Sequence, residues 1–362
     1  SGDEFYLFFS GYSTKEELQQ IISQMRQDMS ETYLDLPDGQ RLKLRASAGV
    51  AWYPEDSRSI SELIRYADFA MYEVKNAVKG GLKDFDIQTY QRDSFLLYSR
   101  EELNRIVEER LVNFVFQPIV NCRTGDILGF EALMRPRSKA LASPLDILRI
   151  ARAQSKLYQV ERLTWFGAME TFAALPEEIR GKDRLIFINS LPNQALTTED
   201  LQEFDQLYRK DLTRVVIELT ESDEQDLTWT QIKQQRCREV HQHLALDDFG
   251  TGYNSNSILL EMSPDFVKID MGIVRGIDRD QGRRTIFQNL VTFCHSKGIQ
   301  VVAEGVETRA EMETVVSLGV DHIQGFYFAM PQRLPAPIRQ DLLKTLAQAR
   351  EQRTGVTLSA DL

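Results

Sequence analysis

Eight apolar, strand-like runs recur from about Val112 onward, and helical patterns lie between most of them. The runs are FVFQPIV (114–120), ILGFEALMR (127–135), RLIFINS (184–190), RVVIELTE (214–221), LALDDFG (244–250), DFVKID (265–270), IQVVAEGVE (299–307) and HIQGFYFAM (322–330). One intervening helical pattern, RRTIFQNLVTFCHSKG, ends at Gly298, a normal helix stop. Such alternation predicts an α/β fold, a (β/α)8 TIM-like barrel, with a doubly wound sheet as the next candidate.

The first two runs depart from a regular barrel. Residues 121–126 connect them, and this connection is too short to contain a crossover helix. Because parallel neighbours need a longer connection, the first strand is predicted to pair antiparallel with the second.

Polar side chains stand near the carboxyl end of seven of these runs. They are Glu131, Asn189, Glu218, Asp247 with Asp248, Lys268, Glu304 and Gln324. A single glutamate at a strand end is usually a solvated charge. Seven strands that offer such groups at the same end instead predict an active site, because barrel enzymes carry their sites there.

Asp247 and Asp248 form an adjacent acidic pair at the end of a buried strand. Two neighbouring carboxylates repel each other, and burial strengthens the effect, so a cation is expected between them. The three cysteines and four histidines show no zinc-type spacing. The metal is therefore expected to be held by oxygen atoms, which favours Mg²⁺ or Mn²⁺.

Charge and composition narrow the class of protein. The net charge of −11 argues against a nucleic-acid polymer as partner, but not against a small anion held through metal ions. We expect no membrane contact in this segment, which has no apolar run long enough to span a bilayer. Scattered cysteines fit a reducing cytoplasm. A membrane or sensor region upstream of Ser1 remains compatible with the sequence.

The first 90 residues have a different pattern. DEFYLFF (3–9) and LRASAGVAWYP (44–54) predict strands, and SISELIRYADFAMYEVKN (59–76) predicts an amphipathic helix. Residues 89–110 predict a helical connector.

Six ordered motifs resemble the EAL family of cyclic di-GMP phosphodiesterases. They are FEALMR (130–135), IELTE (217–221), DDFGTGY (247–253), VKID (267–270), VAEGVET (302–308) and QGFYFAMP (324–331). SGDEF (1–5), SAGVAWYP (47–54) and YADFAMYEVKN (66–76) resemble the second half of a GGDEF domain, the nucleotidyl-cyclase-like α+β fold. The resemblance implies a partial, degenerate GGDEF domain at 1–88, a connector at 89–110, an EAL barrel at 111–350 and a tail at 351–362.

The resemblance implies two divalent ions, which together activate water and neutralise phosphate charge. The first ion would be held by Glu131, Asn189, Glu218 and Asp247. The second would share Asp247 and take Asp248 and Glu304. Lys268 would orient the attacking water, Glu304 would act as general base, and Gln324 would complete the metal and water shell.

The resemblance also implies contacts with the substrate. Gln117 and Arg135 would touch the ligand, and period-2 geometry puts Leu133 and Arg135 on the face of Glu131. Asp270 is expected either beside the metals or as a helix N-cap. Glu307 is expected either to contact guanine or to be solvated. Glu221 would steady the loop after DDFG, with a surface charge as the alternative.

The resemblance implies that the protein hydrolyses cyclic di-GMP to linear pGpG. It also implies that the EAL barrel could mediate a homodimer. The alternatives are a receptor that binds cyclic di-GMP without cleaving it, and an unrelated metal-dependent barrel. Every expected metal ligand is present, which favours the enzyme. The loop after DDFG departs from the usual pattern at Asn254 and Asn256, and the incomplete GGDEF half predicts no cyclase activity.

Overall fold

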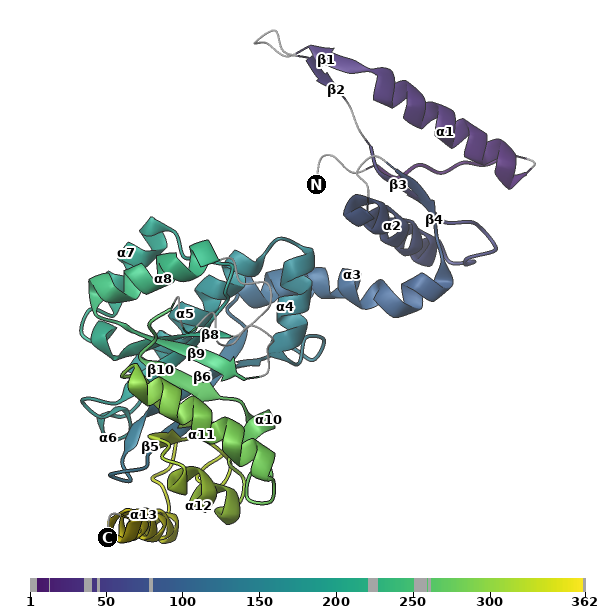
Figure 1. Ribbon diagram of the computed structural model, residues 1–362. Helices are drawn as coiled ribbons and strands as arrows, with labels where there is room; N and C mark the ends of the chain where they lie inside the picture. The colour runs from purple at the N-terminus through teal and green to yellow at the C-terminus, as the bar shows by residue number, and fades with distance from the viewer. Residues whose placement is uncertain are drawn as a thin grey trace. The chain divides into compact units, whose positions relative to one another are not determined.

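The computed structural model describes residues 5–12, 14–35, 41–43, 46–77, 81–220, 227–250, 259 and 262–360. The chain divides into two compact units, Ser1–Glu101 and Glu102–Leu362 (Figure 1). Helix α3 (Ile87–Glu108) contains the boundary between the units and accounts for the helix expected at 89–110. None of the described helices has the length and apolarity needed to cross a membrane.

The second unit is built around a closed barrel (Figure 1). Its eight described strands are β5 (Val112–Asn121), β6 (Ile127–Pro136), β7 (Leu185–Ser190), β8 (Val215–Thr220), β9 (His243–Phe249), β10 (Phe266–Ile269), β11 (Gln300–Ala303) and β12 (His322–Ile323). The described helices are α4 (Pro144–Ala153), α5 (Leu157–Ala173), α6 (Glu177–Arg180), α7 (Thr198–Leu207), the 3-10 turn η1 (Leu212–Arg214), α8 (Leu227–Val240), α10 (Met271–Val274), α11 (Gln281–Ser296), α12 (Arg309–Ser317) and α13 (Gln340–Ala360). The predicted barrel is confirmed.

Strand β5 is antiparallel to both of its neighbours, β6 and β12, whereas the other neighbouring pairs are parallel. This confirms the antiparallel first strand that the short connection predicted. One consequence is that Gln117, in the middle of β5, lies opposite Glu131 on β6. The reversed strand therefore brings an amide to the acidic residue of the next strand.

The last two strands are shorter than their apolar runs predicted. β11 ends at Ala303 and β12 at Ile323, so residues 304–307 and 324–330 lie outside strands. Gly305 has a φ of +64°, and a Cβ there would come 2.4 Å from the Cβ of Met271. This backbone turns out of the strand directly after Glu304, which an apolar run cannot reveal.

Six side chains fill the barrel interior as one buried cluster: Ile119, Phe187, Val216, Ala245, Phe266 and Val302. Each is at most 2% exposed. Their positions fix which residues of each strand point inward, because side chains alternate along a strand. Asn189 on β7 and Asp247 on β9 are two residues beyond Phe187 and Ala245, so both point into the barrel above this floor.

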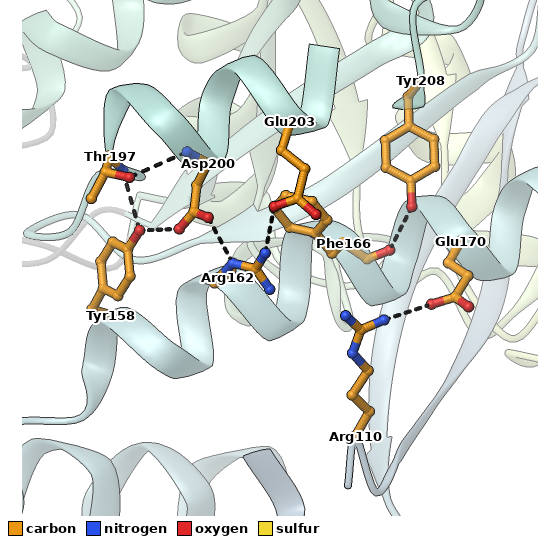
Figure 2. A network of polar contacts seen from close by, with 9 residues as sticks. All are labelled: Arg110, Tyr158, Arg162, Phe166, Glu170, Thr197, Asp200, Glu203 and Tyr208. Atoms are coloured by element: carbon orange, nitrogen blue, oxygen red, sulfur yellow. Dashed lines mark hydrogen bonds and ion pairs between the residues drawn. The ribbon is translucent and has the colours of Figure 1, made fainter. Parts of the chain in front are cut away.

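Helix α5 is joined to α7 on the outside of the barrel (Figure 2). Arg162 lies between Asp200, at 2.9 Å, and Glu203, at 2.6 Å, and the Tyr158 hydroxyl donates to Asp200. Tyr208 donates a hydrogen bond of 3.3 Å to the carbonyl of Phe166. These partly exposed contacts add little stability singly, but together they define how α5 lies against its neighbour.

The first unit consists of α1 (Lys15–Glu31), β1 (Tyr33–Asp35), β2 (Arg41–Lys43), β3 (Ala48–Val50), α2 (Ile60–Ala77), β4 (Leu82–Asp84) and the start of α3. The amphipathic helix at 59–76 is confirmed as α2. Its Tyr66 ring stacks on Phe85 with centroids 4.0 Å apart. A Cβ on Gly49 would lie 2.1 Å from the carbonyl oxygen of Ala67, so α2 packs on β3 at close range.

The strand predicted at 3–9 is wrong for the residues described there. Residues 5–10 lie outside regular structure, and Phe5 and Phe8 are 84% and 72% exposed. Among the described residues β3 pairs only with β4, so residues 5–9 add no strand to that sheet.

Candidate active site at the carboxyl end of the barrel

Lys268 on β10 lies at the centre of a group of carboxylates. Its Nζ is 2.8 Å from Glu218, 2.9 Å from Asp247, 2.8 Å from Glu304 and 3.2 Å from Glu131. The Lys268 side chain is fully buried, and Glu304 is the most exposed of its four partners, at 15%. The structure thus brings together the acidic ends of β6, β8, β9 and β11 around one ammonium group.

The pKa values within this group follow from burial and the excess of negative charge. Burial alone would lower the pKa of Lys268, but Asp247, Glu131, Glu218 and Glu304 raise it well above its ordinary value. Burial raises the pKa of Glu218 and of Glu304 well above the ordinary range, and Lys268 compensates only in part. These two acids therefore hold their protons more tightly than the same groups do in water.

Glu131 is the acid with the best hydrogen-bonded surroundings. Its carboxylate accepts from the side-chain amides of Asn189, at 3.1 Å, and Gln324, at 2.6 Å. Although burial opposes ionisation, Lys268 and these amides hold the pKa of Glu131 below its usual value. Gln324, directly after β12, also donates to Gln117 at 3.3 Å, so three side-chain amides lie next to this carboxylate.

A bulge in β9 directs both aspartates into the site. Val267 of β10 pairs with Leu246, whereas Ile269 pairs with Phe249, so Asp247 and Asp248 together lie opposite Lys268. Asp248 has a φ of +54°, in the left-handed region. An extra residue with this backbone shape is how a strand can turn two consecutive side chains to the same side. Burial, then the neighbouring Asp247 charge, raises the pKa of Asp248 to about 6.

The acids form two triplets that share Asp247. Oxygens of Glu131, Glu218 and Asp247 lie within 4.8 Å of one another, as do oxygens of Asp247, Asp248 and Glu304. Oε1 of Glu218 and Oδ1 of Asp247 contact Nζ of Lys268 without a well-oriented hydrogen bond, and Oε2 of Glu218 is buried with no hydrogen bond within the described residues. Buried oxygens in this state, next to one ammonium for four acids, fit oxygen-liganded divalent cations.

The residues expected to contact substrate lie at different depths. Gln117 is buried and donates to the carbonyl of Ala329 at 3.3 Å. Leu133 is half-buried, and Arg135 is exposed and donates to the carbonyl of Met134 at 2.8 Å. The guanidinium of Arg135 is therefore available at the surface of the same strand that carries Glu131.

Three residues, Asp270, Glu307 and Glu221, each had two expected roles, and the structure describes the first two of these residues. Asp270 is the N-cap of α10 and accepts from the backbone N–H of Gly272 at 2.7 Å, which is the helix-cap alternative. Glu307 is exposed and forms an ion pair with Arg275. Glu221 lies outside the described residues, as do Asn254 and Asn256.

A second buried polar cluster, which the sequence did not reveal, lies next to the site. Glu161 of α5, Ser190 of β7 and Lys233 of α8 are 1%, 6% and 4% exposed and contact one another. The sequence feature that could have revealed this cluster is Glu161, a charged residue among the apolar residues that form the buried face of α5, such as Val160 and Trp165. A buried charge of this kind requires a partner.

Comparisons with known proteins agree with this architecture. Residues 100–331 match the family described as EAL domain, and residues 1–80 match the family described as diguanylate cyclase, GGDEF domain. A standalone EAL protein from Vibrio cholerae, solved in a c-di-GMP-bound form, is 30% identical. It aligns with a TM-score of 0.56 over 64% of this chain and 97% of that one.

Curated relatives include two proteins named as cyclic di-GMP phosphodiesterases. NbdA of Pseudomonas aeruginosa is 27% identical over 93% of this chain and 43% of its own length. PdeR of Escherichia coli is 30% identical over 79% of this chain and 44% of its own length. The chain thus spans less than half of either relative. Since the EAL match covers more than half of the chain, this protein belongs to the EAL domain family.

Proposed function

We propose that this chain hydrolyses cyclic di-GMP to linear pGpG with the help of two divalent cations. The observation that carries the proposal is the pair of acidic triplets that share Asp247. A structural charge cluster needs no such arrangement, whereas two-metal phosphodiester hydrolysis requires ligands on both sides of a shared carboxylate.

Glu131, Asn189, Glu218 and Asp247 would hold one cation, and Asp247, Asp248 and Glu304 the other. When bound, Mg²⁺ or Mn²⁺ would supply a more acidic water and positive charge at the phosphate. The Asn189 amide already donates to Glu131, which leaves its oxygen free to turn toward a cation. Cation binding would also favour the ionised form of these acids.

The chain's own side chains would then divide the remaining work. Glu304 is the most exposed of the acids around Lys268, and its raised pKa suits a group that takes a proton from water. Lys268 would keep the acids converged and offset part of their charge. Arg135 would pair with a phosphate oxygen, as guanidinium groups commonly do.

The relatives support the choice of substrate, because two are named as cyclic di-GMP phosphodiesterases and a solved neighbour carries c-di-GMP. Cyclic di-GMP is therefore the proposed ligand. A homodimer formed through the barrel, a cytoplasmic location and the steadying role of Glu221 stay predictions.

The test is incubation of the purified chain with cyclic di-GMP and either Mg²⁺ or Mn²⁺, with products resolved by chromatography. We expect pGpG that disappears with EDTA and in Glu131→Ala. Glu239→Ala is the matched control, because Glu239 is an exposed glutamate near the end of α8 whose side chain accepts from Gln235.

Tight binding of cyclic di-GMP without turnover in either metal would overturn the enzyme proposal in favour of a receptor. Turnover that survives in Glu131→Ala would overturn the assignment of the site.

A further inference from the structure

A buried network lies directly behind Asn189, on the outer side of the barrel wall. Asn189 points inward, so Ser190, the next residue of β7, points outward to the helices. There its hydroxyl donates to Glu161 of α5 and accepts from Nζ of Lys233 of α8 at 2.6 Å. Trp165 adds its indole N–H to Oε1 of Glu161 at 3.1 Å.

Glu161 and Lys233 hold both polar groups of the Leu191 backbone. Oε2 of Glu161 accepts from the N–H of Leu191 at 2.9 Å, and Nζ of Lys233 donates to its carbonyl at 2.5 Å. Nζ also lies 3.2 Å from Oε1 of Glu161. Lys233 therefore has three acceptors for its three protons, and each oxygen of Glu161 has at least one donor.

Because every polar group in this network has a partner, the network should hold the end of β7 rigidly against α5 and α8. A buried network whose members are all satisfied has one low-energy arrangement, and shifting the β7 end would break several bonds at once. Helix α5 is also held from outside, because Arg162, the neighbour of Glu161, is bound to Asp200 and Glu203 of α7 (Figure 2).

We propose that Glu161, Lys233 and Ser190 are positioning residues that set the place of Asn189, and through it the affinity of the first cation site. This inference rests on the proposed metal-dependent function. Asn189 lies opposite Glu218 in the β7–β8 register and donates to Glu131, so its backbone position governs the spacing of two acidic ligands. Residues that orient a metal ligand in this way change metal affinity without touching the metal.

The test measures Mn²⁺ affinity of the purified chain by electron paramagnetic resonance, together with its thermal stability. Lys233→Met is expected to weaken Mn²⁺ binding at least about tenfold. The matched control is Arg214→Met, which also removes a buried cation that holds backbone carbonyls, those of Arg180, Gly181 and Arg184. Arg214 lies just before β8, at the opposite end of the barrel, so its loss should lower stability but leave Mn²⁺ affinity within about twofold.

Two smaller substitutions, both of Ser190, test the same role if the Lys233→Met variant does not fold. Ser190→Ala removes the shared hydroxyl, and Ser190→Thr keeps it. We expect weaker Mn²⁺ binding in the first variant and near-normal binding in the second. Excess Mn²⁺ should restore the hydrolysis rate of Ser190→Ala, a response that a general folding defect would not give.

Wild-type Mn²⁺ affinity in folded Lys233→Met and Ser190→Ala would overturn the positioning role. Equal weakening by Arg214→Met would also overturn it, because the effect would then follow stability alone. Asn189→Ala separates the two proposals: unchanged Mn²⁺ affinity there and in Glu131→Ala would overturn the metal site itself. Loss in these two variants but not in the Lys233 and Ser190 variants would overturn the positioning role only.

Discussion

Two buried lysines in the same barrel have opposite surroundings. Lys268 contacts four carboxylates, whereas Lys233 contacts one carboxylate, one hydroxyl and one carbonyl. The pKa of Lys268 is raised well above its ordinary value by its acidic neighbours. Burial lowers the pKa of Lys233, and Glu161 opposes this only in part.

The difference separates a structural cluster from a functional one. Around Lys233 charges and hydrogen bonds are matched, so nothing further is required for stability. Around Lys268 negative charge is in excess, and oxygens of Glu218 and Asp247 have no well-oriented hydrogen bond in the described part of the chain. Such an excess costs folding free energy, and the proposed cations would relieve that cost.

The largest effect that tests this comparison is the loss of activity in Glu218→Gln. We expect hydrolysis of cyclic di-GMP to fall at least about 1,000-fold, or about 4 kcal/mol in transition-state free energy. Urea unfolding in EDTA should show no loss of stability, because the change removes a buried charge that nothing fully neutralises. A large loss of stability would mean that Glu218 is a structural acid.

The second prediction concerns Glu161→Gln, the same chemical change in the matched cluster. It leaves Lys233 buried without its carboxylate, so the free energy of unfolding should fall by about 3 kcal/mol. The measurement is again urea unfolding in EDTA. If Glu161→Gln and Glu218→Gln lose equal stability, the contrast between the clusters is wrong.

The third prediction is metal-dependent stability. Adding Mn²⁺ at about 100 times its dissociation constant should stabilise the barrel by about 2.7 kcal/mol, seen as a higher Tm in calorimetry. Glu218→Gln should show little of this shift at the same Mn²⁺ concentration. An equal shift in both proteins would indicate that Mn²⁺ binds elsewhere.

The smallest effect concerns pH and Asp248. Its pKa is raised from 3.8 to about 6 by burial and Asp247, so the folded protein holds a proton that the unfolded chain releases. Its contribution to stability is therefore present below pH 3.8 and lost as the pH rises through 6. Neighbouring atoms desolvate the Asp248 carboxylate in part, which raises its pKa, but the residue as a whole is exposed. Solvent screening therefore reduces the effect to less than about 1 kcal/mol.

The measurement is thermal unfolding in EDTA across this pH range, with Asp248→Asn as the comparison. Wild type should lose stability relative to the variant as the pH rises. Parallel curves for the two proteins would show that the carboxyl group of Asp248 has an ordinary pKa.

Strand order and the acidic end of the barrel were predictable, because both depend on patterns within single segments. Glu131, Glu218, Asp247 and Glu304 each lie within or directly after an apolar run, and closing the barrel brings them together. The features that the sequence did not predict depend on contacts between segments that are far apart in the chain. Lys233 gives no local sign that it reaches Leu191, and the turn at Gly305 depends on its approach to Met271.

The bulge at Asp247 and Asp248 also changes which residues of β9 point into the barrel and which point outward. Before it, odd-numbered residues such as Ala245 face the barrel interior; after it, Phe249 shares the register of Ile269 and faces the helices instead. Deleting Asp248 should remove the bulge and restore simple alternation, with Phe249 still opposite Ile269 and its ring still toward the helices, which a structure of the deletion variant would reveal. One extra residue therefore doubles the acidic side chains at the mouth without turning the phenyl ring of Phe249 into it.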